Sequence, residues 1–394
     1  MFSHRTPADL APNSLTRAVA AARADRRPFI DLTESNPTRA GFAYPADLLA
    51  PLADPRGLTY TPLPFGLVDA RRAVAAEYER RGFGVSPDRI VLTSSTSEAY
   101  ALLFKLLADA GDEVLVPRPS YPLFEHLTGL ELVAARSYDL EPDARWGIDF
   151  TSIERSVTPR TRAVLVVSPN NPTGSYVSAE DYARLAEFCA QRDVAIIADE
   201  VFADYELTSG AARKAGVLAQ QPDVLGFSLG GLSKSIGLPQ IKLAWIAVSG
   251  RDAVVRTALD RLELICDSYL SVSTPVQVAA AELLARGAGV RDQIRCRVSS
   301  NYRQLQTRVA GAPACRVLPS DGGWYGVVQV PSLEPEESLA VGLLVDDGVL
   351  AHPGYFFDFP RESFLIVSLL TPEGPFAEGV DRLLRRFRNA GVHD

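Results

Sequence analysis

Lysine is scarce in this chain of 394 residues, and its few positions are the first place to look for amine chemistry. Lysine and arginine together number 40, and lysine occurs only at Lys105, Lys214, Lys234 and Lys242. The remaining 36 are arginines, which stay protonated and cannot act as amine nucleophiles. Each lysine is therefore a candidate for chemistry, although we expect Lys105 and Lys214 to be ordinary surface residues.

Lys234 and an acidic residue, Asp199, each follow a short apolar run that predicts a buried strand. Asp199 follows VAIIA at 194–198, and Lys234 comes 35 residues later, shortly after VLGFS at 224–228. Ligands of an open parallel sheet bind beyond the carboxyl ends of its strands, so both side chains should face one crevice. A carboxylate at the end of a buried strand also needs a cationic partner.

Two polar segments follow other predicted strands. The segment SSTSE at 94–98 opens a helix, where small hydroxyl residues offer N–H and O–H donors to a phosphate. Ser95 and Glu98 also fit an ordinary capping box. The segment SPNNPTG at 168–174 is, by itself, typical of any tight turn. Neither pattern alone separates a ligand site from a structural cap or turn.

The elements that must position these residues alternate along the middle of the chain. Strand-like apolar runs lie at 89–93, 113–117, 163–167, 194–198, 224–228 and 243–248. Helical patterns separate them, including a capped crossover helix over 178–192. This alternation predicts a mostly parallel sheet covered by helices.

The pattern changes from about residue 251. Long helices follow, including one expected over 290–309, then a strand-like segment at 322–330 and a terminal helix over 376–388. We expect a second, smaller α+β domain that packs closely on the first and encloses a site with it.

Composition and charge exclude several classes of function. Hydrophobic residues make up 47% and charged residues 22%, as in soluble globular proteins, and the net charge of -8 argues against nucleic-acid or anionic-membrane binding. The N-terminus lacks an apolar signal region, and no apolar stretch approaches the roughly 18 residues of a membrane span. The cysteines form no CxxC pair and the histidines no HExxH pattern, so we expect no metal site. A cytoplasmic enzyme acting on small molecules fits best.

Seven motifs in a fixed order resemble those of the fold-type-I, pyridoxal-phosphate-dependent aminotransferases of the class I/II family. They are YTPLPFGLVDARRAVA at 60–75, TSSTSEA at 93–99, PRPSYP at 117–122, SPNNPTG at 168–174, ADE at 198–200, LSK at 232–234 and HPGYFF at 352–357. Each is weak alone, but their order is specific. The resemblance runs from about Asp31 to the C-terminal helix. It implies an α/β fold like that of aspartate aminotransferase and pyridoxal 5'-phosphate as the cofactor.

The resemblance also implies domain limits and an assembly. A segment over 1–45 would cover the active site and join the small domain. The large cofactor-binding α/β domain would span 46–285, and the small C-terminal α+β domain would span 286–394. Tyr60 would reach the phosphate of the neighbouring subunit's cofactor, so a homodimer with shared active sites is expected.

A role for each matching site residue follows from the resemblance. Lys234 would form a Schiff base with the cofactor aldehyde and then carry the proton at the substrate's α-carbon. Asp199 would keep the pyridine nitrogen protonated, so that the ring can accept electrons. Asn171 would hydrogen-bond the ring phenolate, and Tyr121 would stack on the ring. The phosphate would be bound by Ser95, Thr96, Ser97 and Lys242.

Around the cofactor, three positions depart from the family's pattern. Phe202 stands where a tyrosine usually bonds the phenolate, which should raise the pKa of the Schiff base, although Tyr205 could compensate. Lys242 replaces a phosphate-binding arginine, and in a chain so rich in arginine a retained cation explains this better than drift. Gly231 replaces a phosphate-binding serine.

A further departure concerns the substrate. Ile366 stands where an arginine normally binds the substrate α-carboxylate in a bidentate pair, which an apolar side chain cannot do. Either another group binds the carboxylate, or the preferred substrate has none. Arg39 in the N-terminal segment and Arg361 are the candidates for this contact, and Asn36 is expected to bind the substrate with them. We favour Arg39 and an α-amino acid substrate.

The expected reaction is ping-pong exchange of an amino group between an amino acid, or an amine, and a 2-oxo acid. A lyase, decarboxylase or oxidase on the same fold is the alternative, because the orientation of the α-carbon bonds decides among them and sequence does not show it. A cofactor-sensing regulator would need a DNA-binding segment ahead of residue 31, and no basic helix-turn-helix pattern is found there.

Overall fold

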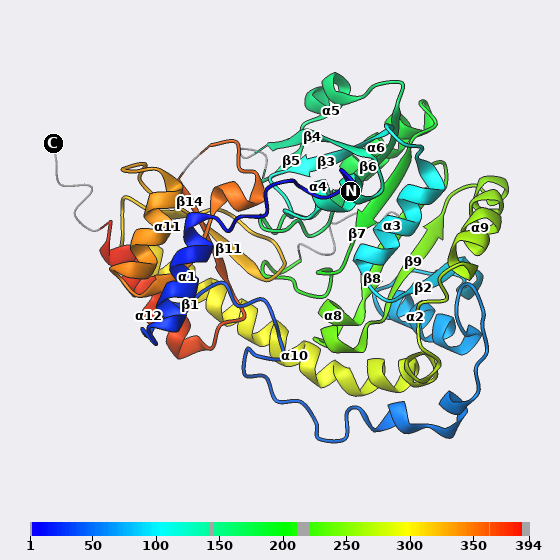
Figure 1. The fold of residues 1–394 in the computed structure, drawn as a ribbon, viewed down its shortest axis with the longest axis horizontal. Coiled ribbons are helices and arrows are strands. Elements are labelled where there is room, and N and C mark those ends of the chain that lie inside the picture. The colour runs from blue at the N-terminus through cyan, green and yellow to red at the C-terminus, as the bar shows by residue number, and fades with distance from the viewer. Residues whose placement is uncertain (1, 142–144, 211–220, 362, 388–394) are drawn as a thin grey trace.

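The computed structural model describes residues 2–141, 145–210, 221–361 and 363–387. Within these residues the strands form an eight-stranded sheet, a four-stranded sheet and a two-stranded ribbon. The large sheet builds one half of the molecule and the four-stranded sheet builds the other, as Figure 1 shows. We call these the large half and the small half.

The large half consists of the eight-stranded sheet and the helices that cover it. Its strands are β2 (Ile90–Thr93), β3 (Glu113–Arg118), β4 (Ala134–Glu141), β5 (Gly147–Ile148), β6 (Thr161–Val167), β7 (Ala195–Asp199), β8 (Gly226–Gly231) and β9 (Ala244–Ser249). Its helices are α2 (Val68–Arg80), α3 (Thr96–Leu107), α4 (Phe124–Leu130), α5 (Phe150–Ser156), α6 (Ala179–Ala190), α8 (Leu232–Ser235) and α9 (Asp252–Asp267). All six strands expected from the sequence are present, with ends shifted by at most three residues.

The order of strands across the large sheet is β2-β9-β8-β7-β6-β3-β4-β5. The run from β4 through β3, β6 and β7 to β8 is parallel, whereas β9 is antiparallel to both of its neighbours. Leu103 of α3 and Leu262 of α9 pack on one face of the sheet, and Ile153 of α5 and Leu185 of α6 pack on the other. Because helices cover both faces, the central strands are mostly apolar.

The small half begins with the long helix α10 and ends with the C-terminal helix α12. Its strands are β10 (Arg316–Val317), β11 (Tyr325–Gln329), β13 (His352–Pro353) and β14 (Phe364–Ser368), and its helices are α10 (Thr274–Ala310), α11 (Glu336–Val345) and α12 (Glu373–Arg385). Short 3-10 turns are η1 (Ala50–Ala53), η2 (Pro55–Leu58), η3 (Pro87–Arg89), η6 (Pro239–Ile241) and η7 (Gly354–Phe357).

The N-terminal segment joins the small half. Its helix α1 (Ser14–Ala24) packs on α11, and its strand β1 (Ile30–Asp31) pairs in parallel with β12 (Val349–Leu350). No helix in the described part of the chain is both long and apolar enough to cross a bilayer.

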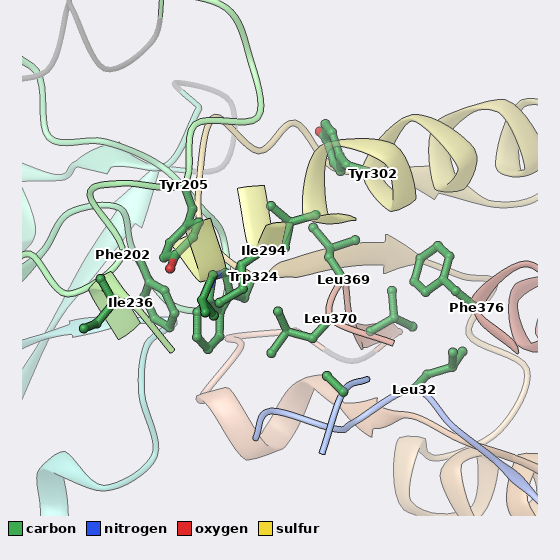
Figure 2. Close-up of a cluster of buried hydrophobic side chains, with 14 of the residues drawn as sticks. Leu32, Phe202, Tyr205, Ile236, Ile294, Tyr302, Trp324, Leu369, Leu370 and Phe376 are labelled. Atoms are coloured by element: carbon green, nitrogen blue, oxygen red, sulfur yellow. The ribbon is translucent and has the colours of Figure 1, made fainter. Parts of the chain in front are cut away.

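Helix α10 connects the two halves, packing on α2 in one and on α12 in the other (Figure 1). It begins at Thr274 and not near residue 290, as the periodicity had predicted, so the expected boundary between 285 and 286 falls inside one continuous helix. An apolar cluster also continues across the halves. In Figure 2 it runs from Phe202 and Tyr205 past Trp324 to Leu32. The two halves therefore share one core.

Candidate active site

Asp199 ends β7, and its carboxylate is enclosed by donors. The Tyr100 hydroxyl donates to Oδ2 at 3.1 Å, and the Val201 N–H donates to Oδ1 at 3.1 Å. Burial raises the pKa of the Asp199 carboxyl to about 6, while these two hydrogen bonds and the positive charge of Lys234 act in the opposite direction. A carboxylate held in this environment is poised to pair with a further cation.

Lys234 lies in the short helix α8, directly after β8. Strands β7 and β8 are neighbours, with Asp199 opposite Leu229, so the chain segments that follow them lie at the same edge of the sheet. The Lys234 amine lies 4.9 Å from the ring centre of Trp324 and 5.7 Å from that of Phe202. Burial lowers the pKa of this amine, and the Asp199 charge acts in the opposite direction. Such an amine is a suitable nucleophile.

Asn171 follows β6 on the other side of β7. Its side chain is buried and makes no hydrogen bond within the described residues, although a buried amide without a partner costs about 1 to 3 kcal/mol. Its neighbour Asn170 differs, because its amide donates to the Pro119 carbonyl at 3.0 Å and to Thr173 Oγ1 at 2.9 Å. Asn170 thus holds the loop together, and Asn171 is available to a ligand.

Helix α3 begins at the same edge of the sheet. Ser95 is its N-cap: Oγ accepts the Glu98 N–H at 3.1 Å, and the Glu98 carboxylate accepts the Ser94 N–H at 2.6 Å, so capping is real. The first-turn amides of Thr96 and Ser97 have no acceptor inside the helix. They and the helix dipole are therefore available to an anionic group.

Lys242 brings a positive charge to this edge. It precedes β9, which lies between β2 and β8, and Ala244 of β9 pairs with both Thr93 and Gly231. Lys242 therefore lies beside the segments that lead into α3 and to Lys234. Its side chain is exposed, and its backbone is left-handed with φ 58°. Lys105, by contrast, is far along α3, is exposed and pairs with Glu131 at 2.6 Å, and Lys214 lies outside the described residues.

The donor set fits one kind of ligand. A carboxylate suits a protonated ring nitrogen, the free Asn171 amide suits a ring oxygen, and the α3 N-terminus with Lys242 suits a phosphate. The buried Lys234 amine suits an aldehyde. In the described ranges, no group of three or more His, Cys, Asp or Glu side chains is placed to hold a metal ion.

The chain is similar to known proteins. Residues 27–383 match the model of the family described as aminotransferase class I and II. This chain belongs to that family. It is 26% identical over 379 residues to the alanine aminotransferase of Mycobacterium tuberculosis, covering 92% of this chain and 86% of the relative. It is 25% identical over 376 residues to the glutamate-pyruvate aminotransferase AlaA of Escherichia coli, covering 92% and 91%.

Solved structures share the fold of this aminotransferase. The TM-score is 0.88 against the alanine aminotransferase from Pyrococcus furiosus, at 22% identity and covering 99% and 100% of the two chains. It is 0.84 against a single mutant of the Thermus thermophilus aspartate aminotransferase, at 22% identity and covering 98% and 99%. The expected fold class and the expected aminotransferase family are therefore both confirmed.

Two tyrosines assigned to the aminotransferase site from the sequence lie at its surface. Tyr121 follows β3, is 38% exposed and packs edge-on against Phe124. Burial raises the pKa of the Tyr121 hydroxyl, and the nearby Asp199 charge adds to this effect. Tyr60 is 71% exposed and has no neighbour from the reaction centre among the described contacts.

The structure explains two of the departures near the cofactor position. Tyr205 does not compensate for Phe202, because its hydroxyl donates to the carbonyl oxygen of Lys234 and its ring is fully buried. That expectation was wrong, and Tyr205 instead holds the backbone of the lysine. At Gly231, an added Cβ would lie 2.9 Å from the Ala244 Cβ, so a serine would not fit without displacement of β9.

Two residues of the site were not predicted. Tyr100 could have been found, because it lies one helical turn after Thr96 on α3 and so near the same strand ends. Trp324 carries no comparable signal. It precedes β11 in the small half and reaches Phe202 and Tyr205 with ring centres 5.3 and 5.2 Å apart.

The residues considered for substrate binding differ in burial and in hydrogen bonding. Ile366 is fully buried in an apolar cluster with Phe364, so it offers nothing to a carboxylate. Asn36 accepts hydrogen bonds from the N–H and hydroxyl of Thr38, which closes a local turn. Arg39 and Arg361 are exposed, and neither forms an ion pair within the described residues.

Proposed function

We propose that this aminotransferase uses pyridoxal 5'-phosphate to exchange an amino group between an amino acid, or an amine, and a 2-oxo acid in two half-reactions. The observation that supports this best is the placement of Asp199 and Lys234 at the ends of adjacent parallel strands. The cofactor supplies an aldehyde that takes up the amino group and a ring that accepts the electrons released at the α-carbon.

Each residue of the site would have its own role. Asp199 holds the ring nitrogen's proton, and Asn171 donates its amide N–H to the ring oxygen, while Tyr121 covers the ring. The neutral form of the Lys234 amine, favoured by its burial, takes the proton from the α-carbon and returns it. Ser95, Thr96, Ser97 and Lys242 would bind the phosphate.

The role of Lys242 can be tested by cofactor retention. We expect Lys242→Ala to weaken binding of the cofactor by about 10- to 100-fold, because a hydrogen bond to a charged group contributes roughly 1.5 to 3 kcal/mol. The turnover rate at saturating cofactor should fall much less. Equilibrium dialysis measures the first quantity and steady-state kinetics the second. Lys242→Arg is the matched control and should be tolerated. If the alanine variant retains the cofactor as tightly as the parent, Lys242 does not bind the phosphate.

We also propose a homodimer in which Tyr60 reaches the partner's cofactor phosphate. Tyr60 and Tyr269 are 71% and 54% exposed and border the same surface hollow, with Leu58 nearby at 89%. Exposed aromatic and aliphatic side chains gathered in this way are typical of a protein interface. The partners otherwise are small molecules in the cytoplasm, with no nucleic acid or membrane.

For the substrate carboxylate we keep Arg39 as the proposed contact. Its guanidinium is exposed, has no ion-pair partner in the described ranges, and lies in the segment that meets β14 through Glu34 and Ser368. A guanidinium can grip a carboxylate by two parallel hydrogen bonds. Arg361 is the second candidate.

The decisive test of the function uses the purified holoenzyme and a panel of amino donors without any acceptor. We expect one equivalent of oxo product per active site, together with the aminated form of the cofactor, because the half-reaction stops there. Absorbance and mass spectrometry measure both products. Release of carbon dioxide, ammonia or peroxide with the aldehyde form restored would mean decarboxylation, elimination or oxidation, and would overturn the proposal.

A further inference from the structure

The N-terminal segment holds Glu34 against the small-half sheet through the main-chain carbonyl of this residue. The Ser368 hydroxyl of β14 donates to the Glu34 carbonyl oxygen at 2.6 Å. Ser368 pairs directly with Tyr325 of β11, and side chains of directly opposed residues lie on the same face of a sheet. Glu34 and Tyr325 are therefore neighbours on that face.

Tyr325 connects Glu34 to the reaction centre. Burial raises the pKa of the Tyr325 hydroxyl to about 12, with the nearby Tyr121 and Glu34 acting in the same direction and a hydrogen bond to Ser35 opposing it. The pKa of the Tyr121 hydroxyl is in turn raised by burial and by the nearby charge of Asp199. The Tyr325 ring lies 6.2 Å from that of Phe357, and the Phe357 carbonyl accepts the Ser120 N–H at 2.9 Å, so Tyr325 lies on the side of the small half that meets the segment carrying Tyr121.

The Glu34 carboxylate is held in place by a hydrogen bond but is not paired with a cation among the described residues. Its Oε1 accepts the Asn36 N–H at 2.7 Å, which holds the side chain in place. Its Oε2 accepts no hydrogen bond, and no cationic side chain lies within ion-pair distance, in the part of the chain that the structure describes. The residue is only half-buried, so this oxygen is accessible to a ligand.

The same sheet face offers no competing charge at Ile366. This side chain lies two residues before Ser368 along β14, and so on the same face, and is fully buried in an apolar cluster that includes Phe357. His352 of β13 lies directly opposite Ile366 and so shares this face, and burial lowers the pKa of its imidazole to about 4, so it adds no positive charge at neutral pH. The described groups on this face are therefore a carboxylate, hydroxyls, a neutral imidazole and hydrocarbon. The carboxylate and hydroxyl oxygens accept hydrogen bonds from an ammonium or guanidinium, and the carboxylate repels an anion.

We infer that Glu34 binds a second positively charged group on the amino donor, at the end away from the amino group that is transferred. The donors are then basic compounds, either a primary diamine or an α-amino acid with a basic side chain. This inference rests on the proposed transamination. The pairing satisfies a half-buried carboxylate that has no cationic partner among the described residues, and it disfavours donors with an acidic side chain.

Pairs of donors of equal length that differ in distal charge provide the test. Lysine is compared with norleucine, and 1,5-diaminopentane with pentylamine, in single-turnover reactions of the holoenzyme followed by cofactor absorbance. We expect the second-order rate constant of each charged donor to exceed that of its neutral partner by about 10- to 100-fold, as a charged hydrogen-bond pair allows. If lysine exceeds 1,5-diaminopentane, and Arg39→Ala removes the difference, the donor is a basic amino acid. The opposite order identifies a diamine.

The matched variant is Glu34→Gln, whose amide oxygen can still accept the Asn36 N–H and keep the turn. It should lose the preference for charged donors while neutral donors react as in the parent. Glu180→Gln, an exposed site on α6, should change neither. Equal rates within each pair in the parent, or a preference that survives in Glu34→Gln, would overturn the inference with transamination intact. If no donor converts the cofactor, the proposed function fails and the inference falls with it.

Discussion

Replacing Asp199 with asparagine is expected to slow amino-group transfer by about 10²- to 10⁴-fold while the protein still folds. Removing one charge of a buried pair costs about 3 to 5 kcal/mol, and each 1.4 kcal/mol corresponds to about tenfold in rate. The asparagine Oδ1 can accept the Val201 N–H while its Nδ2 donates to the Tyr100 hydroxyl oxygen, but this neutral amide cannot hold the proton on the ring nitrogen. Single-turnover kinetics with an α-deuterated donor should show that α-proton removal is the slowed step. Turnover near that of the parent would remove Asp199 from this role.

The same substitution should stabilise the cofactor-free protein at neutral pH. The pKa of Asp199 is raised from 3.8 to about 6, so the folded state binds more protons than the unfolded state between these values. The free energy of unfolding then falls as pH rises through this window, by about 3 kcal/mol for a shift of about two units. Asparagine carries no charge and avoids this loss.

Unfolding of the cofactor-free parent and of Asp199→Asn at pH 4 and pH 8 measures the effect. We expect similar stability at pH 4 and a more stable variant at pH 8, by up to about 3 kcal/mol. Asp260→Asn is the control, because Asp260 is exposed on α9 and forms no ion pair within the described residues. A stability difference that does not change with pH would show that burial of the Asp199 charge is not its cause.

The reaction centre in the large half was largely predictable because it depends on local patterns. Apolar runs mark β7 and β8, and Asp199 and Lys234 follow them. Once a mostly parallel sheet is inferred, the carboxyl ends of its strands must share one edge. The scarcity of lysine then singled out Lys234 without knowledge of any contact.

The roles of the two neighbouring asparagines could not be derived from the pattern of residues. Asn170 and Asn171 both follow β6, and the sequence alone treats them as parts of one turn. In the structure the Asn170 amide is committed to Pro119 and Thr173, while the Asn171 Oδ1 has no hydrogen-bond partner among the described residues. This distinction depends on how the 117–122 loop packs, and such packing has no signature at either asparagine.

The start of α10 was missed for an identifiable reason. Gly287 and Gly289 lower intrinsic helix propensity, so the periodicity favoured a helix that begins after them. Packing overrides this preference, because a Cβ at Gly287 would lie 2.7 Å from the Ile236 side chain. The glycine allows α10 to approach the segment that follows Lys234. The two residues in this contact are about fifty positions apart in the sequence.

Contacts between distant segments account for the other misses. Trp324 and Tyr205 surround Lys234 from different halves of the molecule, and the Ser368 hydroxyl binds the carbonyl of Glu34 across 334 positions. Each side chain is ordinary in its local sequence. Only the three-dimensional arrangement turns Glu34 from a surface acid into a residue beside the proposed substrate.

Replacing Lys234 with alanine is expected to have the largest effect, a loss of about 10⁴-fold or more in turnover. The substitution removes both the amine that attaches the cofactor and the base that moves the α-proton, and proton transfer alone contributes about 10²- to 10⁴-fold. The nearby rings of Phe202 and Trp324 carry no group that could replace it. Lys234→Arg should be equally inactive, because a guanidinium is not a nucleophile.

Borohydride reduction followed by peptide mapping separates this role from a structural one. The reduced cofactor should be found on Lys234 in the parent and in Lys242→Ala, and on no lysine in Lys234→Ala. Small primary amines should restore part of the activity of the alanine variant, since they can enter the space left beside Trp324 and supply the missing base. Lys242 is the only serious rival, but it is exposed at the phosphate side of the site, whereas Lys234 is half-buried near Asp199, with an amine whose pKa is lowered by burial. Reduced cofactor on the peptide that carries Lys242 in the parent would show that Lys242, and not Lys234, attaches the cofactor. That result would overturn the arrangement proposed for the site.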